Sequence, residues 1–168
     1  MAKITLKGNS IHTCGELPTL GEKPPQFRLV DKDLKDRKLG EFIGKKLLIA
    51  TVPSLDTGVC SQMTRHFNEF AKKHPEITFL TISTDLPFAQ GRFCEKEGVQ
   101  NVITLSMMRD KEFGKTYGVL IVDGPLEGIL ARSILVVNEQ GKVIYRELVP
   151  EIAEEPNYAK ALESLQIS

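Results

Sequence analysis

The sequence lacks tryptophan entirely, and it contains only three cysteines and three histidines among 168 residues. A chain of this length has room for an ample core, and such a small number of cysteines does not predict a framework of structural disulfides. One His/Cys pair, His12 and Cys14, is closely spaced, but no second pair at ligand spacing accompanies it, so we expect no zinc or other metal site. Cys-x-x-Cys is also absent, which excludes dithiol oxidoreductase chemistry.

An excess of charge of one sign is missing as well, because 22 Lys and Arg balance 22 Asp and Glu. This balance gives no electrostatic reason to expect nucleic acid or an anionic membrane as a partner. No apolar run approaches the roughly 18 residues of a membrane-spanning helix. The first nine residues alternate polar and apolar side chains instead of forming the apolar core of a signal peptide. We therefore expect a soluble, cytoplasmic protein.

The length and the pattern of apolar residues indicate one α/β domain over 1–168. An N-terminal hairpin over 2–14 is expected to turn at Gly8-Asn9, whereas the charged run 31–38 is expected to be a solvated loop. Further predicted strands lie at 27–30, 39–42, 47–52, 77–82, 101–105, 130–137 and 142–148, and predicted helices at 58–73, 87–98, 110–117 and 156–165. Residues 83–85, Ser-Thr-Asp, are expected to supply the N-cap of the helix at 87–98. This order predicts a mixed central sheet flanked by helices, and it resembles the thioredoxin-like arrangement with an added hairpin.

The stretch VPSLDTGVC, residues 52–60, joins a predicted buried strand to the first long helix. Pro53 ends the strand, Thr57 is expected to cap the helix, and Cys60 falls in its first turn. Unpaired backbone N–H groups and the helix dipole favour an anion there. The sequence thus predicts that Cys60 is readily present as a thiolate, the nucleophilic form of cysteine.

The spacing Pro53-x-x-x-Thr57-x-x-Cys60 has the form of the active-site motif of the peroxiredoxins. Longer stretches resemble one branch of that family, the bacterial thiol peroxidases, which are atypical two-cysteine enzymes. These stretches are PSLDTGVCSQ at 53–62, STDLPFAQGRFC at 83–94, NVITLS at 101–106 and YGVLIVDGPLEGILARS at 117–133. The resemblance covers essentially the whole chain.

This resemblance implies a role for each of five residues. Cys60 matches the peroxidatic cysteine, which attacks the peroxide, and Cys94 matches the resolving cysteine, which forms an intramolecular disulfide with it. Thr57 and Pro53 match positions that line the peroxide pocket. Arg132 matches an arginine that a later strand brings to the thiolate, and a guanidinium suits this task because it stays charged.

Residue patterns alone leave other interpretations open. Cys94 has the spacing of a buried residue in a helix, and Arg132 has that of a strand-end arginine that reaches solvent. Cys14 matches no functional position of the family that we can identify, and we interpret it as incidental. A second function is compatible with the same two cysteines. A redox-sensing interaction protein would use oxidation of Cys60 and Cys94 to change partners and need not consume peroxide catalytically. A purely structural α/β domain would form no disulfide in response to peroxide.

The resemblance also implies an activity and partners. The chain is expected to reduce hydrogen peroxide and organic hydroperoxides, to be recycled by thioredoxin, and to form a homodimer. It implies no metal, flavin or nucleotide cofactor. Both cysteines are predicted to lie in helices, and a disulfide requires Cα atoms within ~7 Å. We therefore expect the segment 86–96 to loosen on oxidation.

Overall fold

The structure is a computed structural model that describes residues 1–166. The strands are β1 (Lys3–Leu6), β2 (Asn9–His12), β3 (Arg28–Asp31), β4 (Asp36–Lys38), β5 (Lys46–Thr51), β6 (Ile77–Ser83), β7 (Ile103–Ser106), β8 (Ser133–Val137) and β9 (Val143–Leu148). The helices are α1 (Gly58–Lys73), α2 (Pro87–Glu97), α3 (Phe113–Thr116) and α4 (Tyr158–Ser164), with a short 3₁₀ helix, η1 (Leu39–Glu41).

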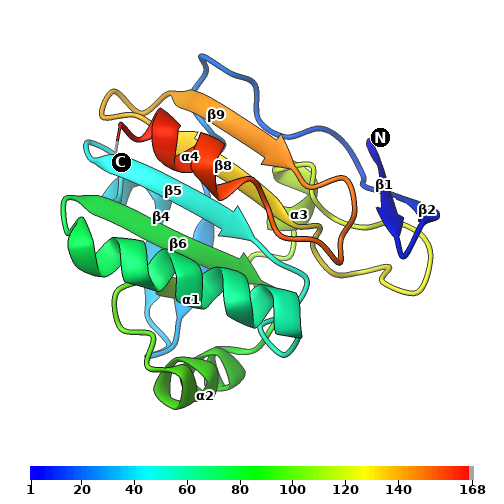
Figure 1. The fold of residues 1–168 in the computed structure, drawn as a ribbon, viewed down its shortest axis with the longest axis horizontal. Coiled ribbons are helices and arrows are strands. Elements are labelled where there is room, and N and C mark those ends of the chain that lie inside the picture. Colours follow the sequence, from blue (N-terminus) through cyan, green and yellow to red (C-terminus); the bar gives the residue numbers. More distant parts are fainter. Residues whose placement is uncertain (167–168) are drawn as a thin grey trace.

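The predicted mixed sheet is confirmed. Within the described residues it has seven strands in the order β4-β3-β7-β6-β5-β8-β9, and β1 and β2 form a separate hairpin. The central strands β5, β6 and β7 are parallel, whereas β8 and β3 pair antiparallel with the outer sides of this group. Figure 1 shows α1 and α4 lying across one face of the sheet, with the hairpin at one end of the molecule.

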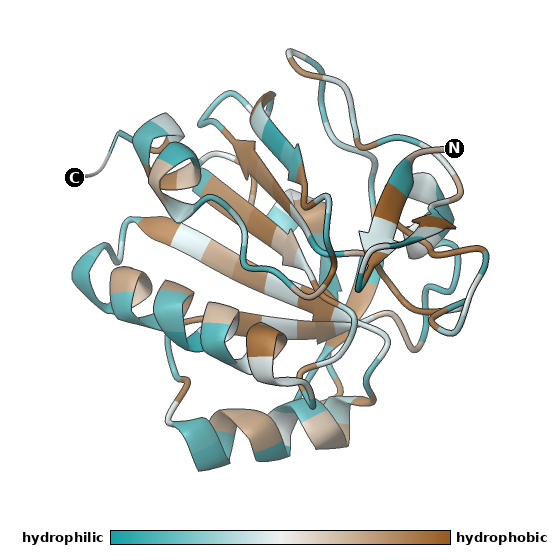
Figure 2. Ribbon diagram, turned by 45° about the vertical axis from the view of Figure 1, so that its right-hand side comes forward, coloured by the Kyte–Doolittle hydropathy of each residue, from teal (hydrophilic) through white to brown (hydrophobic). Residues whose placement is uncertain are grey.

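Both faces of the central strands are buried, because neighbouring side chains of a strand point to opposite faces. In β5, Leu47 and Ile49 join one hydrophobic core, which also contains Phe113 of α3. Leu48 and Ala50 point the other way, into a core shared with α1, α2 and α4. A strand that is covered on both faces has a continuous apolar run, and this run is the feature from which β5 was predicted as a buried strand. Figure 2 shows the hydrophobic central strands and the hydrophilic bands along α1.

Helix α1 has the predicted bounds, 58–73. Its buried face carries Met63, Phe67 and Ala71, at helical spacing. Removing Phe67 from water contributes about 2 to 3 kcal/mol. The helix ends with two lysines in its last turn, where a positive charge is favourable, and just before the His74-Pro75 pair that blocks its continuation.

Several predicted elements are corrected by the structure. The hairpin turns at Lys7-Gly8, one residue earlier than predicted, and both residues have positive φ (50° and 84°), as a two-residue hairpin turn requires. Segment 39–42 was predicted as a strand, but residues 39–41 form the 3₁₀ helix η1 and Phe42 is its C-cap. The charged run 31–38 contains a strand, β4, which lies at the edge of the sheet, where one side needs no partner and charged side chains reach water.

The ends of other elements also shift. The segment predicted as a strand over 130–137 is regular only from Ser133, and Leu130 makes an isolated bridge to Leu120 instead. The short helix predicted at 110–117 shortens to 113–116. Helix α2 ends as predicted at Gly98, which has the left-handed conformation (φ 67°) favoured by glycine.

Candidate active site

The two residues at the centre of the site are Cys60 and Arg132, which lie 72 residues apart in the sequence. The strand β5 leads into α1, and Thr51 at its end pairs with Ser133 at the start of β8. This register places the residue before β8 beside the first turn of α1. Nη1 of Arg132 donates a hydrogen bond to Sγ of Cys60 over 3.2 Å. The predicted meeting of these two side chains is therefore present in the fold.

The guanidinium of Arg132 is buried, with 2% of the residue exposed. Its Nε and Nη2 donate to the carbonyl oxygen of Ile152 at 3.2 and 2.9 Å, and Nη1 lies 3.7 Å from Sδ of Met63. A buried positive charge is costly unless an anion compensates it. The carbonyl and the thioether are neutral, so a thiolate at Cys60 is the anion that these contacts can supply. The interpretation that Arg132 reaches solvent from a strand end is wrong.

Cys60 is fully enclosed, with 0% exposure, in the first turn of α1. The loop before it, residues 52–57, which we call the β5–α1 loop, begins with buried Val52 and Pro53 and becomes exposed at Asp56. Pro53 thus lies at the base of the loop, against the core. This enclosure restricts the approach of solvent to the sulfur.

Thr57 lies at the N-cap position of α1 with an extended backbone, and its carbonyl accepts the hydrogen bond from the N–H of Ser61. Its side chain does not cap the helix, contrary to the prediction. The Thr57 hydroxyl instead donates to the carbonyl oxygen of Ser54 over 3.0 Å. The hydroxyl is exposed, and in this arrangement its one proton stays within the loop.

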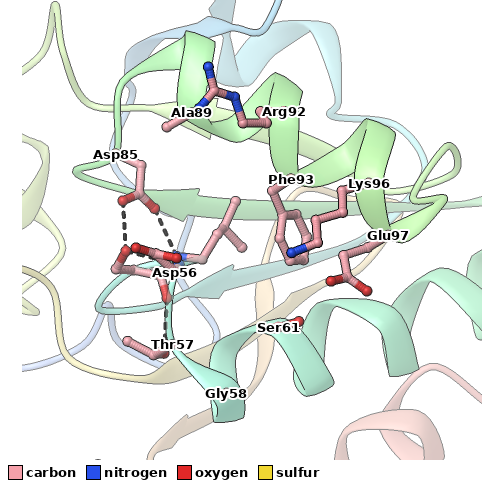
Figure 3. Close-up of a pocket in the computed structure, with 12 residues that line it drawn as sticks. Asp56, Thr57, Gly58, Ser61, Asp85, Ala89, Arg92, Phe93, Lys96 and Glu97 are labelled. Carbon is pink, nitrogen blue, oxygen red and sulfur yellow. Dashed lines mark hydrogen bonds between the residues drawn. The ribbon is translucent and has the colours of Figure 1, made fainter.

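Asp85 holds the β5–α1 loop in place from the end of the neighbouring strand β6. Its Oδ1 accepts from the Ser54 hydroxyl at 2.8 Å, and its Oδ2 accepts from the backbone N–H of Leu55 at 2.8 Å and from the Ser83 hydroxyl at 2.7 Å. Figure 3 shows Asp85 reaching from the α2 side toward this loop. Residues 83–85 were predicted to supply the N-cap of α2, but the N-cap is Leu86, without a side-chain cap bond. Sequence reasoning missed this contact between segments 30 residues apart.

A cleft of about 540 Å³ opens between the N-terminus of α1 and the exposed face of α2. Figure 3 shows Arg92, Phe93 and Lys96 of α2 across the cleft from Gly58 and Ser61 of α1. The full lining consists of Ser54, Leu55, Asp56, Thr57, Gly58, Ser61, Asp85, Ala89, Arg92, Phe93, Lys96 and Glu97. The cleft therefore reaches the residues on either side of Cys60.

Cys94 lies in α2, 4% exposed, in the same hydrophobic core as Cys60. Its Sγ lies 3.7 Å from the hydroxyl of Thr104, and burial raises the pKa of its thiol. It lines a second pocket, of about 130 Å³, together with Lys32 and Thr104. Cys60, Cys94 and Cys14 are all free thiols, so the structure is that of the reduced chain.

Cys14 is half-buried, with its Sγ 3.6 Å from the carbonyl oxygen of Gly114. His12, two residues before it, is bound by Asp123, whose two carboxylate oxygens accept from the backbone N–H and meet Nδ1, each at 2.7 Å. These contacts attach the hairpin to the loop that follows Ile121.

None of the helices within residues 1–166 is long and apolar enough to cross a membrane.

Comparison with known proteins agrees with this geometry. The chain matches the Redoxin family over residues 19–162. It is 51% identical to the thiol peroxidase of Mycobacterium bovis over 98% of this chain and 99% of that protein, and 46% identical to the thiol peroxidase of Leptospira interrogans over 96% of both. A peroxiredoxin-like protein from Aquifex aeolicus has the same fold, with a TM-score of 0.92 and 42% identity over 99% of this chain and 96% of the other.

These similarities confirm the thioredoxin-like fold and the predicted thiol-dependent peroxidase class. They extend over nearly the full length of the chain and of each relative, so the hairpin, the sheet and both cysteine-bearing helices fall within the matched region. The chain belongs to the bacterial thiol peroxidases of the peroxiredoxin family.

Proposed function

We propose that this thiol peroxidase reduces hydrogen peroxide and organic hydroperoxides through Cys60, with Cys94 as the resolving thiol and thioredoxin as the reductant. The observation that carries the proposal is the contact between the buried Arg132 guanidinium and the Cys60 sulfur. It joins a nucleophile to a fixed positive charge in an enclosed site, where electrostatic interactions are stronger than in water.

In the first step the Cys60 thiolate attacks one oxygen of the hydroperoxide. A sulfur–oxygen bond forms, the O–O bond breaks, and the second oxygen leaves with the electron pair of that bond. It takes a proton from water and departs as an alcohol, or as water when the substrate is hydrogen peroxide. Sulfur is oxidised by two electrons and becomes a sulfenic acid. Arg132 stabilises the thiolate and the negative charge that develops on oxygen.

Pro53 and Thr57 have supporting roles in this proposal. Pro53 has no N–H to donate and packs at the base of the β5–α1 loop, where it limits access of water and of a second peroxide to the sulfur. Thr57 is placed beside the first turn of α1, at the cleft. When substrate enters, its hydroxyl would turn from the Ser54 carbonyl to an oxygen of the peroxide.

In the second step the Cys94 thiol attacks the sulfenic sulfur of Cys60. The disulfide forms and the sulfenic oxygen leaves as water, taking up the thiol proton. Cys94 is buried and its pKa is raised in the reduced structure, so this thiol is unreactive until the helix around it loosens. Loosening of residues 86–96 therefore remains part of the proposal, and amide hydrogen exchange that is faster there in the oxidised protein would support it.

In the third step a dithiol protein reduces the disulfide: one of its thiolates attacks a sulfur of the Cys60–Cys94 bond, and its second thiol completes the exchange. Thioredoxin is the donor that the family resemblance implies. We further propose a homodimer, which the resemblance implies, together with a cytoplasmic location and a single domain over 1–168, as expected from the sequence. Leu86 and Phe88 are 53% and 66% exposed at the start of α2, an apolar surface that a second copy would cover.

A steady-state assay tests the proposal. Purified protein at submicromolar concentration is mixed with thioredoxin, thioredoxin reductase, NADPH and either hydrogen peroxide or cumene hydroperoxide. We expect many turnovers per enzyme molecule, complete loss in Cys60→Ser, and loss of thioredoxin-dependent turnover in Cys94→Ser. Cys14→Ser is the matched control and should retain the wild-type rate. Consumption of a single equivalent of peroxide, without turnover, would instead indicate a redox sensor.

A further inference from the structure

We propose that Asp85 is a positioning residue that couples the β5–α1 loop to α2, so that its carboxylate favours peroxide attack at Cys60 and opposes disulfide formation with Cys94. The inference rests on the proposed roles of the two cysteines. Asp85 is placed to do this because it follows β6 and precedes α2 by two residues, while its acceptors reach the loop that precedes α1.

On the loop side, the carboxylate makes bonds that fix both the side chain and the backbone. The Ser54 hydroxyl and the Leu55 N–H each donate to it at 2.8 Å. The Ser54 oxygen in turn accepts from the N–H of Asp56 at 3.1 Å. Charge-assisted bonds of this kind are stronger than bonds between neutral groups. They hold the loop that sets the start of α1 and hence the position of the Cys60 sulfur against Arg132.

On the helix side, the connection runs through Ser83. Its hydroxyl donates to Asp85 at 2.7 Å and accepts from Nε2 of Gln90 at 3.1 Å. Gln90 is fully buried, and Nε2 also donates to the carbonyl oxygen of Leu105 at 2.9 Å. Gln90 lies one helical turn before Cys94 and inside the segment 86–96, so the proposed loosening of that segment would withdraw Gln90 from Ser83.

The same glutamine also contains a group that favours the opening of α2. Among residues 1–166, the Oε1 of Gln90 is the one buried side-chain nitrogen or oxygen atom that lacks a hydrogen-bond partner. A buried acceptor without a partner destabilises the folded helix, and unwinding would expose it to water. The reduced state is thus held by the Asp85 bonds, while the helix it holds contains a group that gains hydrogen bonds on release.

The two chemical steps need opposite states of this connection. Attack on peroxide needs an ordered loop, because Arg132 must meet the sulfur and the developing charge in a fixed geometry. Resolution, as proposed above, needs the segment 86–96 around Cys94 to loosen, because its thiol is enclosed in the core. Weakening the Asp85 bonds should therefore slow the first step and speed the second.

The variants can be matched to the geometry. Asp85→Ala removes all three bonds. Asp85→Asn keeps one oxygen for the Leu55 N–H and the Ser83 hydroxyl, and its amide can donate to Ser54, whose hydroxyl can rotate. Asp123→Ala is the control, because that carboxylate also holds a backbone N–H and a side chain, both of His12, but at the hairpin.

The test is rapid chemical quench of reduced protein with one equivalent of cumene hydroperoxide, followed by alkylation and mass spectrometry. This readout resolves thiol, sulfenic acid and disulfide at each time point. In Asp85→Ala we expect the rate of Cys60 oxidation to fall by about tenfold or more, because two charge-assisted hydrogen bonds to the loop are lost. The rate of disulfide formation should rise severalfold, because the bond to Ser83 on the α2 side is lost as well. The rates of both steps in Asp85→Asn should lie within about threefold of those of the wild type. In Asp123→Ala both rates should equal those of the wild type.

Equal changes in both rates, unchanged rates, or the same changes in Asp123→Ala would overturn the proposal. If Asp85→Ala does not fold, as judged by circular dichroism, Ser54→Ala provides the test: it deletes the bond to Oδ1 and must shift the two rates in opposite directions, by smaller factors. Wild-type protein in the same experiment distinguishes failure of the proposed function from failure of the inference about Asp85. Failure to form the Cys60–Cys94 disulfide there refutes the proposed function, whereas its formation with no effect at Asp85 refutes only this inference.

Discussion

Replacement of Arg132 by methionine tests the electrostatic basis of the site. Methionine is shorter than arginine but has a similar volume and is apolar, so the change removes the charge and its donors while largely filling the space. The hydrogen bond of 3.2 Å to Cys60 disappears, and with it the buried positive charge that favours a thiolate. A hydrogen bond to a charged group contributes about 1.5 to 3 kcal/mol. At 1.36 kcal/mol per factor of ten, this predicts a peroxide reaction slower by about 10- to 150-fold.

The same substitution should also affect stability, and the two effects can be separated. Arg132 donates twice to the carbonyl oxygen of Ile152, and methionine would leave that acceptor without these donors at a cost of about 1 to 3 kcal/mol. Arg132→Lys keeps the charge but loses the planar set of donors, so its peroxide rate should lie between those of wild type and Arg132→Met. Denaturant unfolding gives the stability change of each variant.

The assay is the second-order rate of Cys60 oxidation in a Cys14→Ser background, measured by quench and mass spectrometry because the chain has no tryptophan to report fluorescence. Alkylation by iodoacetamide at pH 7 measures the thiolate without peroxide and should slow in Arg132→Met. An Arg132→Met protein that is folded and reacts with peroxide at the wild-type rate would refute the assignment of this guanidinium to the chemistry.

Further predictions concern the scaffold. Glu151 accepts hydrogen bonds from the N–H groups of Ala153 and Gly8 and from the Thr5 hydroxyl, and these bonds lower its pKa to about 2. Because the folded-state pKa is below the ordinary 4.5, the contribution to stability is present above 4.5 and is lost as the pH falls toward 2. The protection factors of the hairpin amides, which correct for the pH dependence of intrinsic hydrogen exchange, should fall over that interval, and Glu151→Gln should show little such dependence. Gly118→Ala should destabilise the protein by more than about 2 kcal/mol in denaturant unfolding, because φ is +71° and a Cβ would lie 1.9 Å from the carbonyl oxygen of Glu16. Gly8→Ala, with φ +84° and open space around the Cβ, should cost only about 1 kcal/mol; equal effects of the two substitutions would contradict the steric reasoning.

The elements that could be predicted from sequence are those whose periodicity is local and whose faces are fully buried. β5 contains the continuous apolar run LLIA, β6 consists mostly of apolar and β-branched residues, and α1 carries its buried residues at helical spacing. β4 could not be found in this way, because its residues, Asp-Arg-Lys, are those of a solvated turn. It is a strand only because β3 pairs with it at the edge of the sheet.

The site was predictable where one segment carries it and unpredictable where two segments meet. The position of Cys60 in the first turn of α1 follows from the strand–loop–helix pattern. Its contact with Arg132 depends on the pairing of β5 with β8, which spacing does not reveal and which only the family resemblance indicated. Asp85 was misassigned because a Ser-Thr-Asp run before a proline is typical of a helix cap. Its carboxylate binds a loop that local patterns cannot place.

The most direct test of the account is the fate of Cys60 after a single turnover. Reduced protein is mixed with one equivalent of cumene hydroperoxide, quenched on the millisecond scale, and its disulfides are mapped by mass spectrometry. We predict rapid oxidation that ends in a Cys60–Cys94 disulfide, no fast reaction in Cys60→Ser, and arrest at the sulfenic acid in Cys94→Ser. Reaction at the rate of an ordinary free thiol, or a disulfide through Cys14, would contradict it.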